Sequence, residues 1–165
     1  MAALTAGTQA PEISLSALDG KKFNLREALQ RGPVLAAFFK VSCPVCQYTF
    51  PYLERLHKAY GDQEFTIVGI SQDDRRNTEA FLKEYGITFP TLLDDPKGYA
   101  VSNAYGLTNV PTMFLIGQDG EIEVSSVGWF KKEIEEINQK LAESQKTPPR
   151  PLFQAGEEVR DFRAG

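Results

Sequence analysis

Residues 33–46 read PVLAAFFKVSCPVC, and this stretch decides the fold. Residues 33–40 form an apolar run led by proline, which is typical of a central strand covered on both faces. Cys43 and Cys46 follow. From residue 44 to residue 60 apolar side chains recur every three or four positions, which predicts an amphipathic helix that ends at Gly61. The pair therefore lies where a buried strand gives way to a helix.

Outward from this unit, strand and helix patterns alternate. We expect an N-terminal hairpin, parallel strands joined by helices, and an antiparallel hairpin before the last helix. The fold class is α/β: a central mixed sheet with helices on both faces and an N-terminal β-hairpin extension. The other predicted strands are around 13–15, 22–25, 65–70, 91–93, 112–116 and 122–127, and the other predicted helices are 25–31, 77–85 (capped by Asn77 or Thr78), 98–105 and 131–141.

The chain has 165 residues, 42% of them hydrophobic, which suits one domain with its own core. We place that domain at residues 7–143 and a proline-containing C-terminal tail at residues 144–165. Pro148, Pro149 and Pro151 resist helix and strand, so residues 147–165 are expected to be a tail or a docking arm that can be removed without unfolding the domain. The apolar side chains available for docking are Leu152, Phe153, Val159 and Phe162.

Charge and hydropathy exclude two partner classes. The net charge of -4 comes without any run of basic residues, so nucleic acid is not an expected partner. No apolar stretch approaches the roughly 20 residues that cross a bilayer. Residues 1–10 lack a basic and an apolar signal region, so we expect a cytoplasmic protein as the sequence stands, and a periplasmic or membrane-anchored one if a signal has been removed.

The chemistry of the cysteine pair follows from its place. Cys43 lies at the helix N-terminus, where unpaired N–H groups and the helix dipole stabilise a thiolate, so Cys43 is the predicted nucleophile. Pro44 fits an early helical position that needs no N–H. Cys46 lies one turn deeper and can resolve a mixed disulfide. A zinc site is the first alternative, but His57 is the sole histidine and lies on a predicted polar helix face about 16 Å along the helix. Two inert core cysteines are the second alternative; we expect no metal and no cofactor.

Other residues are less informative. Pro111 precedes a predicted strand, and a cis peptide bond before it would turn the backbone of Val110 toward the cysteines. Trp129 is expected to pack against the sheet ahead of the last helix. The acidic pairs at residues 73–74 and 94–95 are interpreted as turn formers and helix caps, without a site.

Together these motifs resemble the thioredoxin superfamily. Cys-x-x-Cys after a buried strand, Val-Pro-Thr roughly seventy residues later and a closing Asp-Gly hairpin carry the likeness, which spans residues 7–141. The segments 10–13, 18–21, 50–51 and 85–90 are similar to its TlpA/ResA-like branch and its AhpC/TSA relatives. The resemblance implies a thiol-disulfide oxidoreductase in which Cys43 attacks, Cys46 resolves, and a cis peptide before Pro111 helps to dock an extended segment of a disulfide-containing or dithiol protein partner.

The chain departs from the family at three positions. Ser42 stands where the family usually has Trp, so partner contacts beside the sulfur must differ. Ala37 and Thr49 occupy the places of the proton-shuttling acids. Lys40 is the nearest replacement charge: it either lowers the pKa of Cys43 or reaches into solvent.

Two alternative functions stay open beside disulfide exchange. A peroxidase of the AhpC/TSA kind resembles Pro-x-x-x-Thr-x-x-Cys at its reactive cysteine. With Cys46 in that place, Phe39 and Cys43 stand where Pro and Thr belong. A non-catalytic binding module with the same fold is the other alternative, since the acids are missing.

Overall fold

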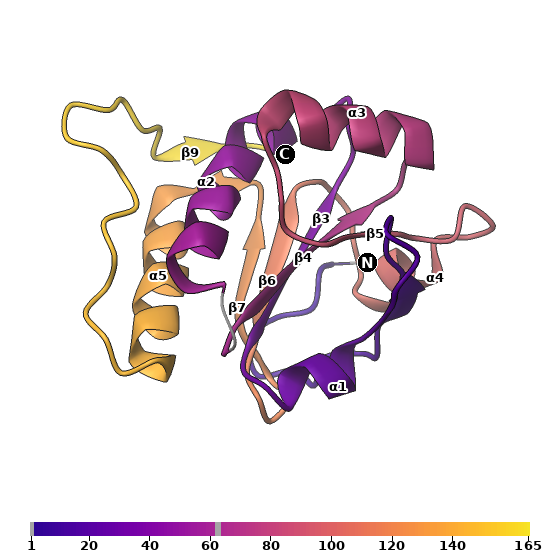
Figure 1. Ribbon diagram of the computed structural model, residues 1–165, viewed down its shortest axis with the longest axis horizontal. Helices are drawn as coiled ribbons and strands as arrows, with labels where there is room; N and C mark the ends of the chain where they lie inside the picture. Colours follow the sequence, from indigo (N-terminus) through magenta and orange to yellow (C-terminus); the bar gives the residue numbers. More distant parts are fainter. Residues whose placement is uncertain (1, 62–63) are drawn as a thin grey trace.

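The centre of the computed structural model, which describes residues 2–61 and 64–165, is a five-stranded mixed sheet (Figure 1). The strand order is β5-β4-β3-β6-β7, with β3, β4 and β5 parallel and β6 and β7 antiparallel to their neighbours. The predicted mixed sheet is confirmed. Its strands are β3 (Val34–Phe39), β4 (Thr66–Ser71), β5 (Thr91–Leu93), β6 (Thr112–Ile116) and β7 (Ile122–Val127).

Helices cover both faces of the sheet, as predicted. One face carries α2 (Pro44–Tyr60), α3 (Arg75–Tyr85) and α5 (Lys131–Ser144). The opposite face carries α1 (Leu25–Leu29), α4 (Ala100–Ala104) and the antiparallel hairpin of β1 (Ser14–Ser16) and β2 (Lys22–Asn24).

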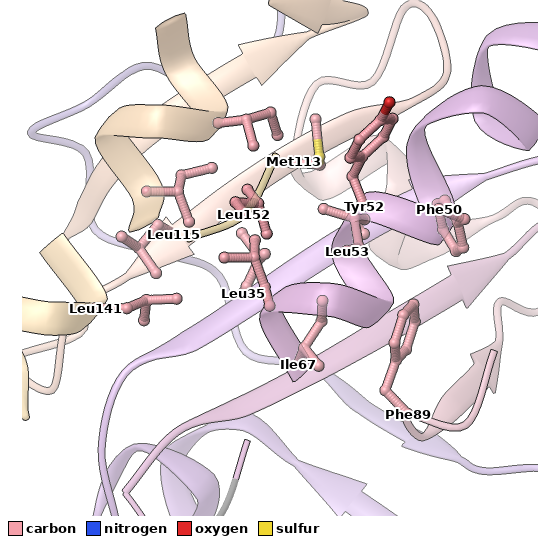
Figure 2. Packing of buried hydrophobic residues seen from close by; sticks show 14 of the residues in the cluster. Leu35, Phe50, Tyr52, Leu53, Ile67, Phe89, Met113, Leu115, Leu141 and Leu152 are labelled. Carbon is pink, nitrogen blue, oxygen red and sulfur yellow. The ribbon is translucent and has the colours of Figure 1, made fainter. Parts of the chain in front are cut away.

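The central strand β3 is apolar throughout because both of its faces are buried. Leu35 (Figure 2) and Phe39 belong to the cluster under α2 and α5, whereas Val34 and Phe38 belong to the cluster on the other face. Side chains alternate along a strand, so only an unbroken apolar run fills both cores. This strand delivers the cysteine pair at its carboxyl end.

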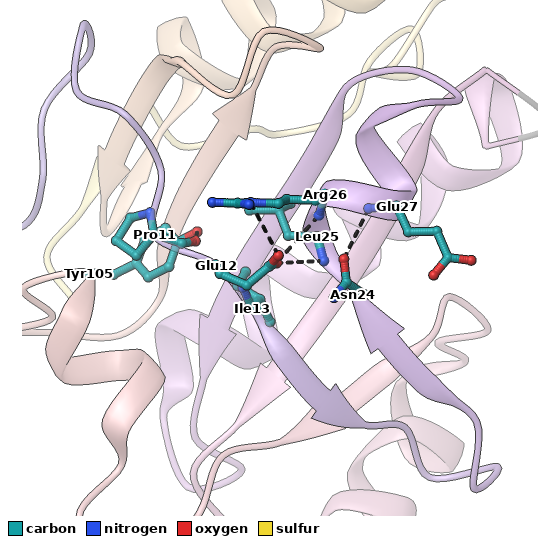
Figure 3. Close-up of polar contacts among 8 residues, drawn as sticks. All are labelled: Pro11, Glu12, Ile13, Asn24, Leu25, Arg26, Glu27 and Tyr105. Carbon is teal, nitrogen blue, oxygen red and sulfur yellow. Dashed lines mark hydrogen bonds and ion pairs between the residues drawn. The ribbon is translucent and has the colours of Figure 1, made fainter.

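Polar contacts hold the N-terminal hairpin to the domain (Figure 3). One carboxylate oxygen of Glu12 accepts a hydrogen bond from the Leu25 N–H at 3.0 Å, at the start of α1. Asn24 caps α1 by accepting from the Glu27 N–H at 3.0 Å. The Tyr105 hydroxyl donates to the Pro11 carbonyl at 2.6 Å. These bonds fix the extension against α1 and the loop after α4.

The start of α3 differs from the expectation. The helix begins at Arg75, and its N-cap is Asp74, which accepts from the Asn77 N–H at 2.8 Å. Thr78 is instead buried and hydrogen-bonded to Ser71 at 2.7 Å. Asp74, Asn77 and Thr78 all have side chains that can cap a helix. Because Thr78 packs against β4, the helix begins one turn earlier and Asp74 becomes the cap.

The last part of the chain is a C-terminal arm, residues 147–165, that folds back along α5 and α2 (Figure 1). Residues 147–151 form neither helix nor strand, as predicted, and the segment is the docking arm of the two alternatives: its β9 (Phe162–Arg163) pairs antiparallel with β8 (Trp129–Phe130). Leu152 is 7% exposed and completes the cluster that α2 and α5 share (Figure 2). The elements before residue 147 therefore leave this core incomplete.

Directional bonds also fasten the arm. Arg55 of α2 donates to the Leu152 carbonyl at 2.9 Å and makes a bidentate pair with Glu157 at 2.8 and 2.7 Å. The indole N–H of Trp129 donates to the Arg160 carbonyl at 2.6 Å. Trp129 was predicted to pack against the sheet; it is fully buried, and its ring packs against Tyr48 and Tyr52 of α2.

The Arg55–Glu157 pair gives the arm a pH dependence. The hydrogen bonds from Arg55 lower the pKa of Glu157 from 4.5 to about 2, so the pair stabilises the docked arm above pH 4.5 and loses that effect as the pH falls toward 2. We expect the emission of Trp129, the single tryptophan, to shift to the red over this range. In Glu157→Gln this transition should be weaker, and in Glu158→Gln it should match wild type; equal behaviour of all three proteins would contradict the role of the pair.

Candidate active site

Cys43 is the N-cap residue of α2, as predicted. Its sulfur accepts a hydrogen bond from the Cys46 N–H at 3.1 Å, and Pro44 is the first helical residue. Proline at this position lacks an N–H that would have no partner in any case. The first turn of α2 therefore directs its N–H groups at one sulfur atom, as an anion at a helix N-terminus requires.

The two thiols have opposite environments. Cys43 is half-buried, whereas Cys46 is 0% exposed, and they are not joined in a disulfide. The hydrogen bond from the Cys46 thiol lowers the pKa of Cys43 to about 6, with help from the backbone N–H groups of Cys46 and Val45, against the opposing effect of burial. Burial, the largest cause, raises the pKa of Cys46. One group is thus an accessible thiolate at neutral pH and the other an enclosed thiol.

This asymmetry predicts a pH profile for alkylation. In the reduced protein, the rate of iodoacetamide labelling at Cys43 should rise with a midpoint near pH 6, because only the thiolate reacts. Cys46 should label last at every pH. Mass spectrometry after limiting alkylation measures both; preferential labelling of Cys46 would reverse the assignment.

The loop before β6 closes the site from the opposite side. The Val110–Pro111 peptide bond is cis, as predicted, and the Cys43 thiol donates to the Val110 carbonyl at 3.4 Å. Thr112 fixes the loop by donating to the Asn109 carbonyl at 2.7 Å. A groove of about 500 Å³ runs between the helix end and this loop, lined by Lys40, Cys43, Pro44, Gln72, Leu107, Thr108, Asn109, Val110 and Gly165.

Two side chains hold the loop that precedes Cys43. Asp73 accepts a hydrogen bond from the Val41 N–H at 2.8 Å, and Gln47 of α2 donates to the Val41 carbonyl at 2.9 Å. The sequence predicts Asp73 as a turn former or helix cap, without a place in the site. Its position two residues after the end of β4 was a usable signal, because β4 is parallel to β3 and both strands end at the same edge of the sheet.

The remaining candidates lie at the rim. Ser42 is exposed beside Cys43, and Lys40 is exposed in the groove. The cation whose charge lowers the pKa of Cys43 is Arg163, which the sequence analysis missed. No local pattern links residue 163 to residue 43, because β9 brings them together only through its pairing with β8.

Neither of the two positions at which the related family carries a proton-shuttling acid has one in this chain. Ala37 and Thr49 are fully buried, and among the described residues the Thr49 hydroxyl has no hydrogen-bond partner. His57 is half-buried, and its ring contacts Phe89 at 6.0 Å between centroids, so its predicted place on a polar face is wrong. The apolar surroundings of Cys46 explain why its pKa is raised.

Across residues 2–61 and 64–165, no three His, Cys, Asp or Glu side chains are grouped so that they could hold a metal ion. Over the same residues, no helix combines the length and the apolar character that crossing a membrane requires.

A thioredoxin-like sheet with a Cys-x-x-Cys pair at the start of α2 and a cis-proline loop opposite defines a thioredoxin-like thiol-disulfide oxidoreductase. Residues 6–125 match the AhpC/TSA family, and the chain belongs to that family. The thiol-disulfide oxidoreductase ResA of Halalkalibacterium halodurans is 35% identical over 134 residues, which are 80% of this chain and 74% of the relative.

Solved structures agree with this assignment. A thiol:disulfide interchange protein of the thioredoxin family from Chlorobium tepidum superposes with a TM-score of 0.70 at 25% identity, covering 86% of this chain and 99% of the other. The thioredoxin domain of a thiol-disulfide oxidoreductase from Bacteroides vulgatus shares the fold, with a TM-score of 0.74 at 24% identity and coverage of 83% and 97%.

Proposed function

We propose that this chain exchanges disulfides with a protein partner, with Cys43 as the attacking and Cys46 as the resolving cysteine of its Cys-Pro-Val-Cys motif. The observation that carries the proposal is the opposite character of the two thiols: an accessible one with a pKa of about 6 and a buried one with a raised pKa. A nucleophile must meet the partner in solution, whereas a resolving thiol must wait until the mixed disulfide has formed.

In the reducing direction the steps are as follows. The Cys43 thiolate attacks a partner disulfide, a bond forms between the two sulfurs, and the partner's other sulfur leaves as a thiolate that takes up a proton. Cys46 then loses its proton and attacks the Cys43 sulfur, which releases the partner's second thiol. The partner gains two electrons, and the pair is left as a Cys43–Cys46 disulfide. The reverse sequence oxidises a dithiol partner.

The groove beside Cys43 suits an extended segment of that partner. Val110 borders it with a backbone carbonyl 3.4 Å from the Cys43 sulfur, and Pro111 holds this backbone in place. Backbone groups at such an edge recognise an extended chain without regard to its side chains. Ser42 is exposed at the rim and offers its hydroxyl to the partner. The tryptophan that the family usually has at this position would instead bury apolar surface against the partner.

The peroxidase and the binding module are less well supported. A peroxidatic Cys46 would need peroxide to reach a sulfur that is 0% exposed and whose thiolate is disfavoured by burial. A binding module needs no thiol with a pKa lowered to about 6. Disulfide exchange, by contrast, uses both the enclosed Cys46 thiol and the lowered pKa of Cys43.

Two assays run in parallel test the proposal. With dithiothreitol as the electron source, the protein should accelerate the reduction of insulin, and in a separate reaction it should consume hydrogen peroxide no faster than free thiol does. Fast peroxide consumption with no insulin reduction would favour the peroxidase. Inactivity in both assays would favour the binding module.

A further inference from the structure

The C-terminal arm reaches the active-site groove. Figure 1 shows the end of the described chain beside the N-terminal end of α2, where Cys43 lies. Gly165 lines the groove together with Cys43 and Val110, and the Asn109 side chain donates to the Gly165 carbonyl at 3.4 Å. The arm tip, residues 164–165, therefore borders the groove, although it lies outside the part of the chain that matches the family.

The arm tip lies against the loop that carries Val110. A Cβ atom at Gly165 would sit 2.4 Å from the Val110 carbonyl oxygen, so the backbone can come this close only at a glycine. The same carbonyl accepts the hydrogen bond from the Cys43 thiol at 3.4 Å. The tip and the nucleophile therefore lie against one backbone group, which the proposed partner segment has to approach.

The tip is held in place by the chain directly before it and beside it. β9 pairs with β8 up to the residue that precedes the tip, and the Lys131 N–H donates to the Asp161 carbonyl at 2.9 Å. A Cβ atom at Gly128 would sit 2.7 Å from the Arg163 carbonyl oxygen and 3.1 Å from the Gly165 nitrogen. The tip therefore forms a fixed wall at this end of the groove.

We propose that the arm tip determines which partners the groove accepts, by excluding disulfides whose neighbouring residues are large. This inference rests on the proposed exchange of disulfides at Cys43. A partner segment that lies along Val110 must place the neighbours of its cysteine where the backbone of Gly165 already stands. Glycine neighbours avoid this contact, whereas an indole collides with a backbone that the β8–β9 pairing keeps from moving away.

The test compares two peptide disulfides of equal charge, one with glycine and one with tryptophan on both sides of the cysteine. Each rate with the pre-reduced protein is divided by the rate with free dithiothreitol, which corrects for the reactivity of the peptide itself. The wild type should prefer the glycine peptide about tenfold. Ending the chain at Arg163 removes two exposed residues and leaves β9 in place. The preference should then fall below about twofold, because the tryptophan peptide reacts faster.

Three controls separate this steric effect from other changes. Phe162→Ala alters an exposed side chain of the same arm outside the groove lining, and should keep the wild-type preference. Iodoacetamide, a small reagent, should label Cys43 of the shortened chain at the wild-type rate at pH 7. Shortening also moves the terminal carboxylate from Gly165 to Arg163. The comparison is therefore repeated in 1 M salt, where charges are screened beyond about 3 Å and a steric effect persists.

Several results would overturn the inference. They are equal rates of the wild type with both peptides, an unchanged preference in the shortened chain, an equal loss of preference in Phe162→Ala, and disappearance of the effect in 1 M salt. Faster iodoacetamide labelling of the shortened chain, by as much as the tryptophan peptide gains, would also overturn it, because the tip would then act on the thiol. These results leave disulfide exchange intact. That proposal fails separately if Cys43→Ser reduces the glycine peptide as fast as the wild type.

Discussion

Replacing Cys43 with serine is expected to slow insulin reduction about 100-fold or more at pH 7. With a pKa of about 6, the Cys43 thiol is mostly ionised at this pH, whereas a thiol with an ordinary pKa of about 8.5 is ionised to only a few per cent. Burial raises the pKa of Cys46 and keeps its sulfur from the partner, so Cys46 cannot substitute for Cys43.

Cys46→Ser is the matched control for this prediction, because it leaves the nucleophile in place. It should form a mixed disulfide between Cys43 and the partner that no longer resolves, and mass spectrometry of the trapped species would identify the bonded cysteine. Two results would contradict the assigned roles. One is turnover by Cys43→Ser above one tenth of the wild-type rate, and the other is a mixed disulfide between the partner and Cys46 in Cys43→Ser.

Ending the chain at Lys146 is expected to lower the melting temperature by about 10 °C, contrary to what the sequence alone suggests. Removing the arm takes Leu152 from the core and uncovers Trp129 and Tyr52. The apolar burial lost, less the regained entropy of the arm, amounts to about 3 kcal/mol. Each kcal/mol corresponds to about 2–4 °C for a chain of this length.

Two point variants separate core packing from the mere presence of the arm. Leu152→Ala should cost about 2–3 kcal/mol, because its side chain is 7% exposed between α2 and α5. Phe162→Ala should cost less than about 1 kcal/mol, because Phe162 is 53% exposed. Melting curves of the three variants decide the matter: a truncated chain that melts with wild type would show that the arm is dispensable.

Much of the site was predictable because its determinants are local. A strand buried on both faces needs an unbroken apolar run, and a helix that begins with Cys43-Pro44 directs N–H groups at the first sulfur, so residues 33–60 determine both the central strand and the more reactive thiol. The cis peptide bond before Pro111 was predicted from the Val-Pro-Thr motif and from its distance along the chain to the cysteines. These features depend on residues that are neighbours in the chain, and their pattern survives in the sequence.

The sequence by itself determined the sheet, the helices and the class of chemistry, and it predicted which of the two cysteines attacks first. Only the tertiary structure decided that Leu152 of the C-terminal arm belongs to the core, that Asp73 and Gln47 hold the loop before Cys43, and that the charge of Arg163 helps to lower the pKa of Cys43. The physical reason is distance along the chain. The influence of residue 163 on residue 43 and the contact between residues 41 and 73 depend on how whole strands pair and pack, and two-residue strands such as β8 and β9 are too short to leave a periodic pattern.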